Sequence, residues 1–388
     1  MCRSQKWLLL LYITFMKKIV FIIIVFILNS CENRTLKYNK VKDIIINNVS
    51  TQTSSLFNYI TINNENHIIF LQNTDSSTNF LIYKENGQFF KSFKLPFKVE
   101  VDEICDKITN DTLYVLYNNS EIVAYNIKNN SLRKYEIIGT IYPPEVDYHL
   151  LTLKAFPFIQ VNDSSFLALI IRHINQSTEE GRRSFGKYNQ LGMLIKRQDT
   201  FYVKNLEIKN PYLFVEKSNS LLVKYCFDGK NIIYEMDNSS WIYKYDLGNK
   251  ICDSFNIPSN YIRDSDFALF KFDHKKSDYY GQAIKFYYEH PYFSKIVYNP
   301  YKKFYYRVNY HRTPYVLPNG RRNNYRNWSV SVLDDKLNLI GEIPFLKDSL
   351  LYYYNITPSS KGFIVMYQLT QEDIRLNRTR LCEYEVSF

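Results

Sequence analysis

Alanine and glycine are scarce in this chain of 388 residues. The sequence contains five alanines (Ala124, Ala155, Ala168, Ala268 and Ala283) and 11 glycines, whereas tyrosine (35) and phenylalanine (27) are abundant. Alanine is the best helix former, while aromatic residues suit the half-buried surfaces of β-sheets. The composition therefore argues against a helical bundle and predicts an all-β protein.

The sequence also lacks the short motifs of common cofactor and catalytic sites. It contains no GxGxxG, P-loop, GxSxG, HxH or HExxH pattern, and no two cysteines form a CxxC pair. Glycine-rich loops bring backbone N–H groups against phosphates, and zinc sites need Cys or His ligands at close spacing. We therefore expect no cofactor and no metal ion.

Charge is only mildly unbalanced, with 49 Lys and Arg against 38 Asp and Glu. The basic residues are mostly interspersed with acidic ones, whereas a nucleic-acid-binding chain concentrates them in runs or stripes. We therefore expect no nucleic acid among the partners.

The N-terminus is typical of an exported protein. Lys17 and Lys18 precede ten apolar residues, Ile19 to Leu28, and a small residue then precedes Cys31. Leu28-Asn29-Ser30-Cys31 resembles the bacterial lipobox, in which the cysteine is lipidated and becomes the first residue. An uncleaved membrane anchor is the alternative, but about 20 apolar residues are needed to span a bilayer.

This pattern divides the chain into three parts. We predict a lipoprotein signal peptide over 1–30 (16–30 if Met16 is the true start), a lipidated linker over 31–40 and a folded domain over 41–388. Lipidation of Cys31 places that domain in the cell envelope. No run of acidic residues follows Cys31, so we expect an outer-membrane protein that faces the periplasm.

Four cysteines remain in the folded domain: Cys105, Cys226, Cys252 and Cys382. An oxidising compartment permits disulfides between them, and four cysteines allow three pairings. Their strand-like and aromatic contexts favour buried free thiols instead.

The folded domain repeats one hairpin pattern. An apolar strand, a polar turn and a second strand recur six times, with the last hairpin cut short at the C-terminus. The marker residues Tyr83, Tyr125, Ile195, Tyr245, Val332 and Tyr384 are 42, 70, 50, 87 and 52 residues apart. Another short apolar strand precedes each hairpin, for example His67 to Leu71 and Thr112 to Tyr117.

A period of 40–50 residues with four strands per unit is the signature of a β-propeller. We predict six blades, closed by the N-terminal strand Val41 to Asn47, which has no hairpin of its own and would join the last blade. A pair of β-sandwiches is the alternative, but it requires a linker near the middle of the chain, and no Pro/Gly/Ser-rich break occurs there.

The chain also resembles a known family. The lipobox, the six hairpins and the stretch Ile296-Val297-Tyr298-Asn299 with Lys302 to Arg307 are similar to Bacteroidetes lipoproteins of unknown function that contain a six-bladed, TolB-like propeller. The resemblance covers most of residues 40–388. It implies the fold and the location, and it transfers no catalytic residue.

Two insertions are the candidate ligand site, because long loops in compact domains are often functional. The first is Arg172 to Gln190, and the second consists of the loops Tyr287 to Tyr292 and Tyr310 to Trp328, which bracket the fifth unit. Both are rich in arginine, which binds carboxylates and phosphates, and in aromatic rings, which stack on sugars and other planar groups. The candidate residues are Arg172, His173, Arg182, Arg183, Tyr188, His290, Tyr306, Arg307, His311, Arg312, Arg321 and Trp328. Solvated basic loops that bind nothing are the alternative.

The sequence therefore favours a non-catalytic binding or scaffold lipoprotein for an anionic or glycan ligand or an envelope protein. A periplasmic propeller enzyme, such as a lyase or glycoside hydrolase, is the alternative, and it would require acidic or Tyr/His pairs at the channel mouth.

Overall fold

The computed structural model describes residues 36–47, 57–99, 103–117, 121–138, 148–150, 158–172, 191–206, 223–268, 278–323, 325–345, 351–367 and 370–388. The chain divides into two compact units, Met1–Lys37 with Phe388 and Tyr38–Ser387. The predicted signal peptide and Cys31 lie outside the described residues, so the fold below is that of the second unit.

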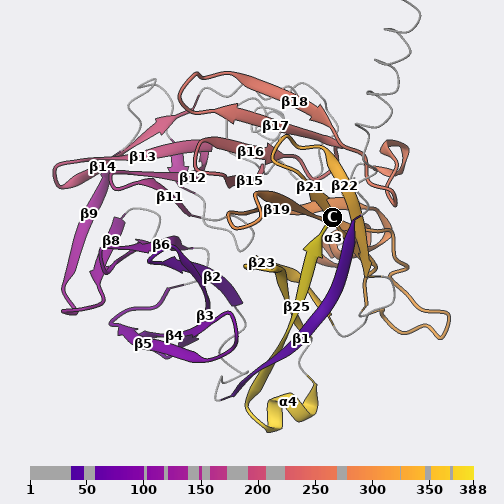
Figure 1. The fold of residues 1–388 in the computed structure, drawn as a ribbon, viewed down its shortest axis with the longest axis horizontal. Helices are drawn as coiled ribbons and strands as arrows, with labels where there is room; N and C mark the ends of the chain where they lie inside the picture. The colour runs from indigo at the N-terminus through magenta and orange to yellow at the C-terminus, as the bar shows by residue number, and fades with distance from the viewer. Residues whose placement is uncertain are drawn as a thin grey trace, which may run out of the picture. The chain divides into compact units, whose positions relative to one another are not determined.

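This unit is built almost entirely of antiparallel meanders (Figure 1). The first two are β2 (Phe57–Ile62), β3 (Glu65–Asn73), β4 (Thr78–Lys84) and β5 (Phe89–Leu95), then β6 (Ile104–Thr109), β7 (Thr112–Tyr117), β8 (Glu121–Asn126) and β9 (Leu132–Ile138). The next are β11 (Ile159–Asn162), β12 (Ser165–Arg172), β13 (Leu191–Arg197) and β14 (Thr200–Asn205), with β10 (Tyr148–Leu150) beside β12, and β15 (Lys224–Phe227), β16 (Asn231–Glu235), β17 (Trp241–Asp246) and β18 (Cys252–Asn256). The last are β19 (Tyr292–Asn299), β20 (Phe304–Tyr310), β21 (Trp328–Leu333) and β22 (Leu339–Phe345), then β23 (Leu351–Pro358), β24 (Gly362–Tyr367) and β25 (Arg378–Ser387) beside β1 (Lys37–Asn47).

Local sequence explains the tight turns within the meanders. Only two residues join β2 to β3 and β6 to β7, Asn63-Asn64 and Asn110-Asp111, and all four have positive φ angles between 51° and 65°. Two-residue hairpin loops with positive φ at both positions match the twist of the strands, and Asn and Asp tolerate this conformation better than other non-glycine residues. Asparagine therefore takes the place of the scarce glycine.

The first strands of successive meanders lie next to one another. β2 pairs with β6 in parallel, and contacts continue from β6 to β11, β15, β19 and β23, and from β23 back to β2. Such neighbouring meanders, with their first strands innermost, are the architecture of a β-propeller. The predicted all-β class is confirmed, and each of the six marker residues, from Tyr83 to Tyr384, lies in a strand.

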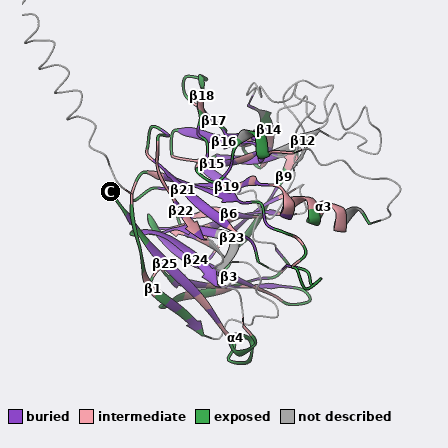
Figure 2. Cartoon of the chain, turned by 90° about the vertical axis from the view of Figure 1, so that its right-hand side faces the viewer, coloured by how far each residue is buried: buried purple, intermediate pink, exposed green. Residues whose placement is uncertain are grey.

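Apolar side chains pack between successive sheets, and much of the length of the inner strands is coloured as buried in Figure 2. Between the fourth and fifth meanders, for instance, Ile233 and Ile242 pack with Ile296 and Tyr305. The outermost strands are much more exposed: β18 has no buried residue, whereas all six residues of β21 are buried. Cys105, Cys226 and Cys382 are buried free thiols, and Cys252 is an exposed one.

The N-terminal strand joins the last sheet, as predicted. β1 is the neighbour of β25, and Lys42 forms an ion pair of 3.5 Å with Glu383. Ile44 and Ile46 are buried and pack with Ile68, Phe70 and Tyr83 of the first meander, as well as with Ile364, Met366 and Leu381 of the last. β1 therefore contacts both ends of the repeat.

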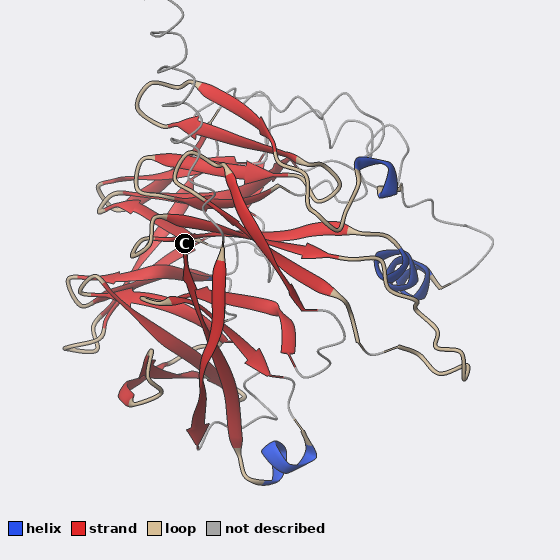
Figure 3. Ribbon diagram, turned by 45° about the vertical axis from the view of Figure 1, so that its right-hand side comes forward, coloured by secondary structure: helices blue, strands red, loops and turns tan. Residues whose placement is uncertain are grey.

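Helices are few in the described part of the chain (Figure 3): η2 (Asp264–Asp266), α3 (Tyr279–Glu289) and α4 (Gln371–Arg375). The sequence did not predict α3, whose two ends are fixed by Asp278 at the N-cap and His290 at the C-cap. Among the described residues, no helix is long and apolar enough to cross a membrane.

Candidate functional site

The predicted site residues of the first insertion are only partly within the described chain. Arg172 is the last residue of β12, and its side chain is not described. His173, Arg182, Arg183 and Tyr188 lie outside the described residues.

Four predicted residues of the second insertion are buried: Tyr306, Arg307, His311 and Trp328. Trp328 stacks on Phe345 with ring centroids 4.1 Å apart, and Tyr306 meets Phe363 edge to face. Tyr306 thus joins the fifth and sixth meanders, whereas Trp328 packs within the fifth. Their burial keeps these side chains away from a ligand at the surface.

Arg307 is part of a buried clasp between the fourth and fifth meanders. Its Nε lies 2.5 Å from Glu235 Oε2, and both side chains are at most 1% exposed. Its other nitrogens donate to the carbonyl oxygens of Ile257 and Ser239, at 2.7 and 2.8 Å, and its guanidinium lies over the ring of Phe293. The guanidinium of Arg307 is therefore neutralised by Glu235 and hydrogen-bonded by backbone carbonyls inside the protein.

His311 belongs to a second buried cluster, with Ser329 and Glu342. His311 Nε2 lies 2.8 Å from Ser329 Oγ, and the same hydroxyl donates to Glu342 Oε1. A catalytic triad instead places the acid on the far nitrogen of the histidine and exposes the serine, whereas Ser329 is fully buried. The cluster contains the residue types of a hydrolase triad, but the serine lies between the histidine and the acid, and it is buried.

Burial also sets the charge of this histidine. It lowers the pKa of His311 to about 4, because desolvation outweighs the attraction of Glu342, and the nearby Arg326 guanidinium lowers the pKa further. His311 is therefore neutral at physiological pH.

The remaining predicted residues of this insertion, Arg312 and Arg321, are exposed. They lie with Arg322, Val316 and Tyr325 on the segment 311–327, which joins β20 to β21. The segment contacts α3: Thr313 N–H donates to the carbonyl of Tyr288 at 2.8 Å, and the Tyr315 ring meets the Tyr288 ring edge to face. We call the exposed residues of 311–327 and of α3 the α3 surface.

The buried side chain of Arg326 holds the α3 surface in place. Its guanidinium lies 4.6–5.3 Å from the ring centres of Tyr288, Tyr292 and Tyr310. It donates to the carbonyl oxygens of Tyr287 and His290 at the end of α3. One arginine thus binds the helix, the loop and the sheet together, so the exposed arginines stand on a rigid base.

His290 takes a structural place in this arrangement. It is the C-cap of α3, its Nδ1 lies 3.0 Å from the carbonyl oxygen of Phe286, and its ring stacks on the Phe286 ring. It is half-buried at the edge of the α3 surface.

The α3 surface is strongly basic. Arg312, Arg321 and Arg322 are exposed on it, and the stretch 290–333 that contains them has eight Lys and Arg and no Asp or Glu. On α3 itself, Glu289 lies 4.0 Å from Lys285. Within the described part of the chain, the side chains of Arg312 and Arg321 form no ion pair. This run without acids is visible in the sequence, and it indicates a basic segment.

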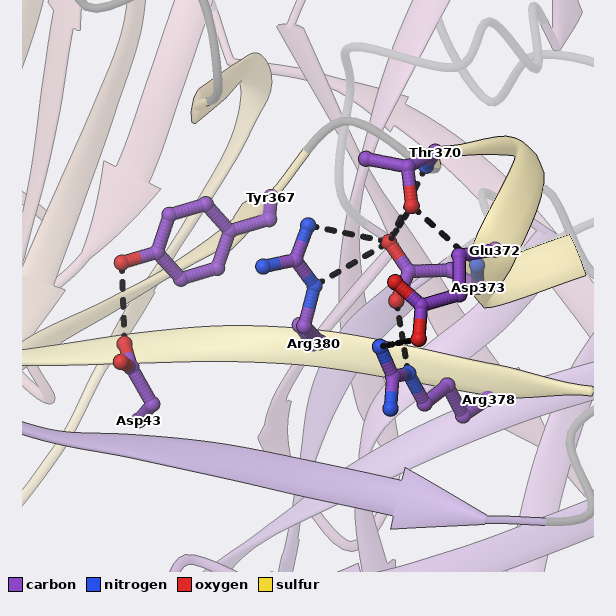
Figure 4. A network of polar contacts seen from close by, with 7 residues as sticks. All are labelled: Asp43, Tyr367, Thr370, Glu372, Asp373, Arg378 and Arg380. Carbon is purple, nitrogen blue, oxygen red and sulfur yellow. Dashed lines mark hydrogen bonds and ion pairs between the residues drawn. The ribbon is translucent and has the colours of Figure 1, made fainter. Parts of the chain in front are cut away.

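A second charged cluster holds α4 in place (Figure 4), and the carboxylate at its centre, that of Asp373, is already bonded by residues of the protein. Asp373 accepts hydrogen bonds from the N–H and hydroxyl of Thr370, and it pairs with Arg378 at 2.7 Å and Arg380 at 3.0 Å. Burial raises the pKa of Asp373, but these hydrogen bonds outweigh it and hold the pKa well below its usual range. Close by, Tyr367 hydroxyl donates to Asp43 at 2.9 Å and so ties β24 to β1.

Metal ligands are not gathered in the described residues, where no group of three His, Cys, Asp or Glu side chains could hold an ion. The exposed arginines and aromatic rings of the α3 surface suit a different task. They can bind anionic groups by forked hydrogen bonds and planar or sugar rings by stacking.

Comparisons with known proteins give the fold. No protein-family model matches the chain, and no curated protein is similar to it in sequence. Among solved structures, it is similar to a member of the DUF4221 family from Bacteroides vulgatus, with a TM-score of 0.66 and 16% identity over 92% of this chain and 99% of the other.

Two further structures are less similar. They are the β-propeller domain of Cps50 (Swd1) from Myceliophteria thermophila (TM-score 0.39, 6% identity, 85% of this chain and 98% of that one) and an oligogalacturonate lyase from Vibrio parahaemolyticus (0.43, 10%, 90% and 97%). At 16% identity the Bacteroides similarity shows the fold alone, and TM-scores below 0.5 carry no argument. This chain shares its fold with a Bacteroides protein of the DUF4221 family.

Proposed function

We propose that the chain is a lipid-anchored, six-bladed β-propeller of the bacterial cell envelope that binds an acidic glycan on the α3 surface without catalysing a reaction. The observation that carries the proposal is that Arg312 and Arg321 are exposed and form no ion pair among the described residues. They lie on a loop that the buried Arg326 holds in place.

Six blades and a closed ring are supported by strand order. Each meander supplies four strands when β1 is counted with β23, β24 and β25. Contacts between neighbouring first strands lead from β2 through the sequence of blades and back to β2. Closure by β1 would remove the free sheet edges at both ends of the repeat.

The lipid anchor is supported by the lipobox at Leu28 to Cys31 and by the short apolar segment before it. The outer membrane, with the propeller facing the periplasm, remains the proposed location. The resemblance to Bacteroidetes lipoproteins, carried by the lipobox and the hairpins, supports a place among the envelope proteins of that phylum.

An acidic glycan fits the α3 surface better than a neutral one. Arg312, Arg321 and Arg322 offer forked donors to carboxylates or sulfates, and Tyr325 offers an exposed ring for stacking. Arginine stays protonated in proteins and is a poor general acid or base, so we assign these arginines a binding role and no catalytic one.

The test is a binding screen with uronic acid and sulfated oligosaccharides against neutral ones, followed by calorimetry on any hit. Losing one charged hydrogen bond costs roughly 1.5–3 kcal/mol. Replacing Arg321 or Arg312 with alanine should therefore weaken binding about 10–100-fold. Arg375→Ala, an exposed arginine on α4, is the matched control and should bind as the wild type does. Equal binding of neutral and acidic glycans, or unchanged binding by the arginine variants, would refute the proposal.

A further inference from the structure

Ionisable side chains occur on the first strands of the meanders, which contact one another in turn around the propeller axis. They include Tyr59 on β2, Asp106 on β6, Lys224 on β15 and Lys295 on β19, all half-buried. Burial raises the pKa of Tyr59, and the Asp106 carboxylate on the neighbouring meander raises it further. The region around the axis is therefore partly lined by groups that can carry charge.

Most of these groups are engaged inside the protein. Asp106 accepts a hydrogen bond of 2.9 Å from a backbone N–H of β11. Burial lowers the pKa of Lys224, and the nearby carboxyl groups of Asp237 and Glu235 raise it. Lys295 differs from both, because its ammonium forms no hydrogen bond and no ion pair with any residue that the structure describes.

A β-bulge explains why Lys295 has no counter-ion. β19 is paired with β20 residue for residue except at Ser294, which is an extra residue. As a result Lys295 is paired with Val308 and lies on the opposite face from Arg307. Without the bulge, Lys295 would be paired with Arg307 and share the face on which Glu235 lies. Bulges redirect side chains in this way, and they are frequent next to functional sites.

The accessible part of Lys295 faces the axis. Val308, its partner on β20, is 1% exposed, and Phe293 and Ile296 on its own strand are 0% and 1% exposed. β19 is the edge strand of its four-stranded sheet, and beyond that edge it contacts the inner strands β15 and β23. Since the surrounding residues are closed, water and small solutes reach the ammonium from the side of the axis.

The positive charge of Lys295 does not stabilise the free protein. Burial lowers the pKa of Lys295 to about 8, so the ammonium form still predominates at neutral pH. A charge that has lost part of its hydration and gained no partner costs folding free energy. Ionisable groups in such surroundings cluster at functional sites. An anionic group of a ligand would supply the missing counter-ion.

We propose that Lys295 binds the carboxylate of a small, singly charged ligand at the axis of the propeller. Lys295 is not part of the α3 surface, and the inference does not rest on the proposed function. One ammonium offers three N–H donors and one positive charge. No other charged group acts on the pKa of Lys295, so a phosphate dianion would keep an uncompensated charge in poorly hydrated surroundings, whereas a carboxylate is neutralised.

The test uses the protein with Arg312 and Arg321 both replaced by alanine, so that the α3 surface contributes little. Saturation-transfer NMR compares glucuronate, which carries one carboxylate, with glucose, its neutral counterpart. We expect glucuronate alone to bind and inorganic phosphate at equal concentration to displace it only weakly. Adding Lys295→Met should weaken binding about 10–100-fold, because a charged hydrogen bond is lost. Lys302→Met, at another half-buried lysine of the β19–β20 hairpin, is the matched control and should leave binding unchanged.

Urea denaturation separates binding from a structural role. Lys295→Met should unfold at the same or a higher urea concentration than its parent, because it removes an uncompensated charge and keeps the length of the side chain. A lower midpoint would show a structural lysine and overturn the proposal. Equal binding of glucose, stronger binding of phosphate, no binding of glucuronate, or unchanged binding after Lys295→Met would also overturn it. None of these results bears on the glycan proposal, which is tested on a protein that retains Arg312 and Arg321.

Discussion

Individual side chains in this protein take roles that their type alone does not reveal. Arg307 and Trp328 have the chemistry of ligand-binding residues, yet both are buried. Arg312 and Arg321, of the same type and from the same stretch, are exposed. Arg307 lies in strand β20, which packs between neighbouring sheets, whereas Arg312 and Arg321 lie on the segment that joins β20 to β21 at the surface. The position in the fold therefore decides whether an arginine is buried or free to meet a ligand.

His311 predicts a pH dependence of stability at the same scale. Its pKa of about 4 in the folded state lies below the ordinary value of about 6.5 that it has in the unfolded chain. The stabilisation from keeping it neutral is complete above pH 6.5. It is lost as the pH falls toward 4, because the unfolded chain then binds a proton that the folded one does not. The charged groups acting on its pKa are Glu342 and Arg326.

We expect this histidine to cost about 2 kcal/mol of unfolding free energy between pH 7 and pH 5, at about 1.4 kcal/mol per pKa unit. Chemical denaturation of the wild type and of His311→Gln at both pH values measures it. The pH-dependent loss should be smaller in His311→Gln. Equal losses in both proteins would show that His311 is protonated without cost.

At the scale of elements, β1 is joined to the rest through the residues of one face. Ile44 and Ile46 are at most 2% exposed and pack against the first meander, while Ile45 between them is 50% exposed. Truncating a buried isoleucine to alanine costs about 2–5 kcal/mol, because apolar burial is lost and a cavity is left.

Ile44→Ala and Ile46→Ala should therefore each lower the free energy of unfolding by about 2–5 kcal/mol. Ile45→Ala should change it by less than about 0.5 kcal/mol. Urea denaturation compares the three variants, and the central one is the matched control. Equal stability of all three would mean that β1 does not hold the first and last meanders together.

Elements differ in how far the sequence predicts them. Alternation and polar turns predicted the hairpins β4–β5, β8–β9, β13–β14, β17–β18 and β21–β22, and the marker residue of each lies in the first strand of its hairpin. The first strands of the meanders were not located individually, because short strands such as β11 and β15 have four residues and no clear alternation. Helix α3 was missed because its sequence, YYGQAIKFYYE, is rich in aromatic residues with weak helix propensity.

For the whole molecule, the lipid anchor predicts where the protein is found. Cys31→Ala removes the thiol that would carry the lipid, and the protein should then be released or retain its signal peptide. Fractionation of cells and labelling with a radioactive fatty acid measure the outcome, with Cys252→Ala as the control for an exposed cysteine. If Cys31→Ala fractionates with membranes and carries the same label, the anchor is elsewhere.

The sequence by itself determined the fold class, the hairpins and the strand that joins the last sheet. These follow from local rules, namely alternation, turn residues and the count of strands, which each segment carries in its own composition. The tertiary structure alone decided which arginines are exposed, that Arg326 supports the α3 surface, and that the turn at Gly87 lies against Ile44 of β1. These depend on contacts between residues far apart in the chain, and no local pattern encodes which face of a strand meets which neighbour.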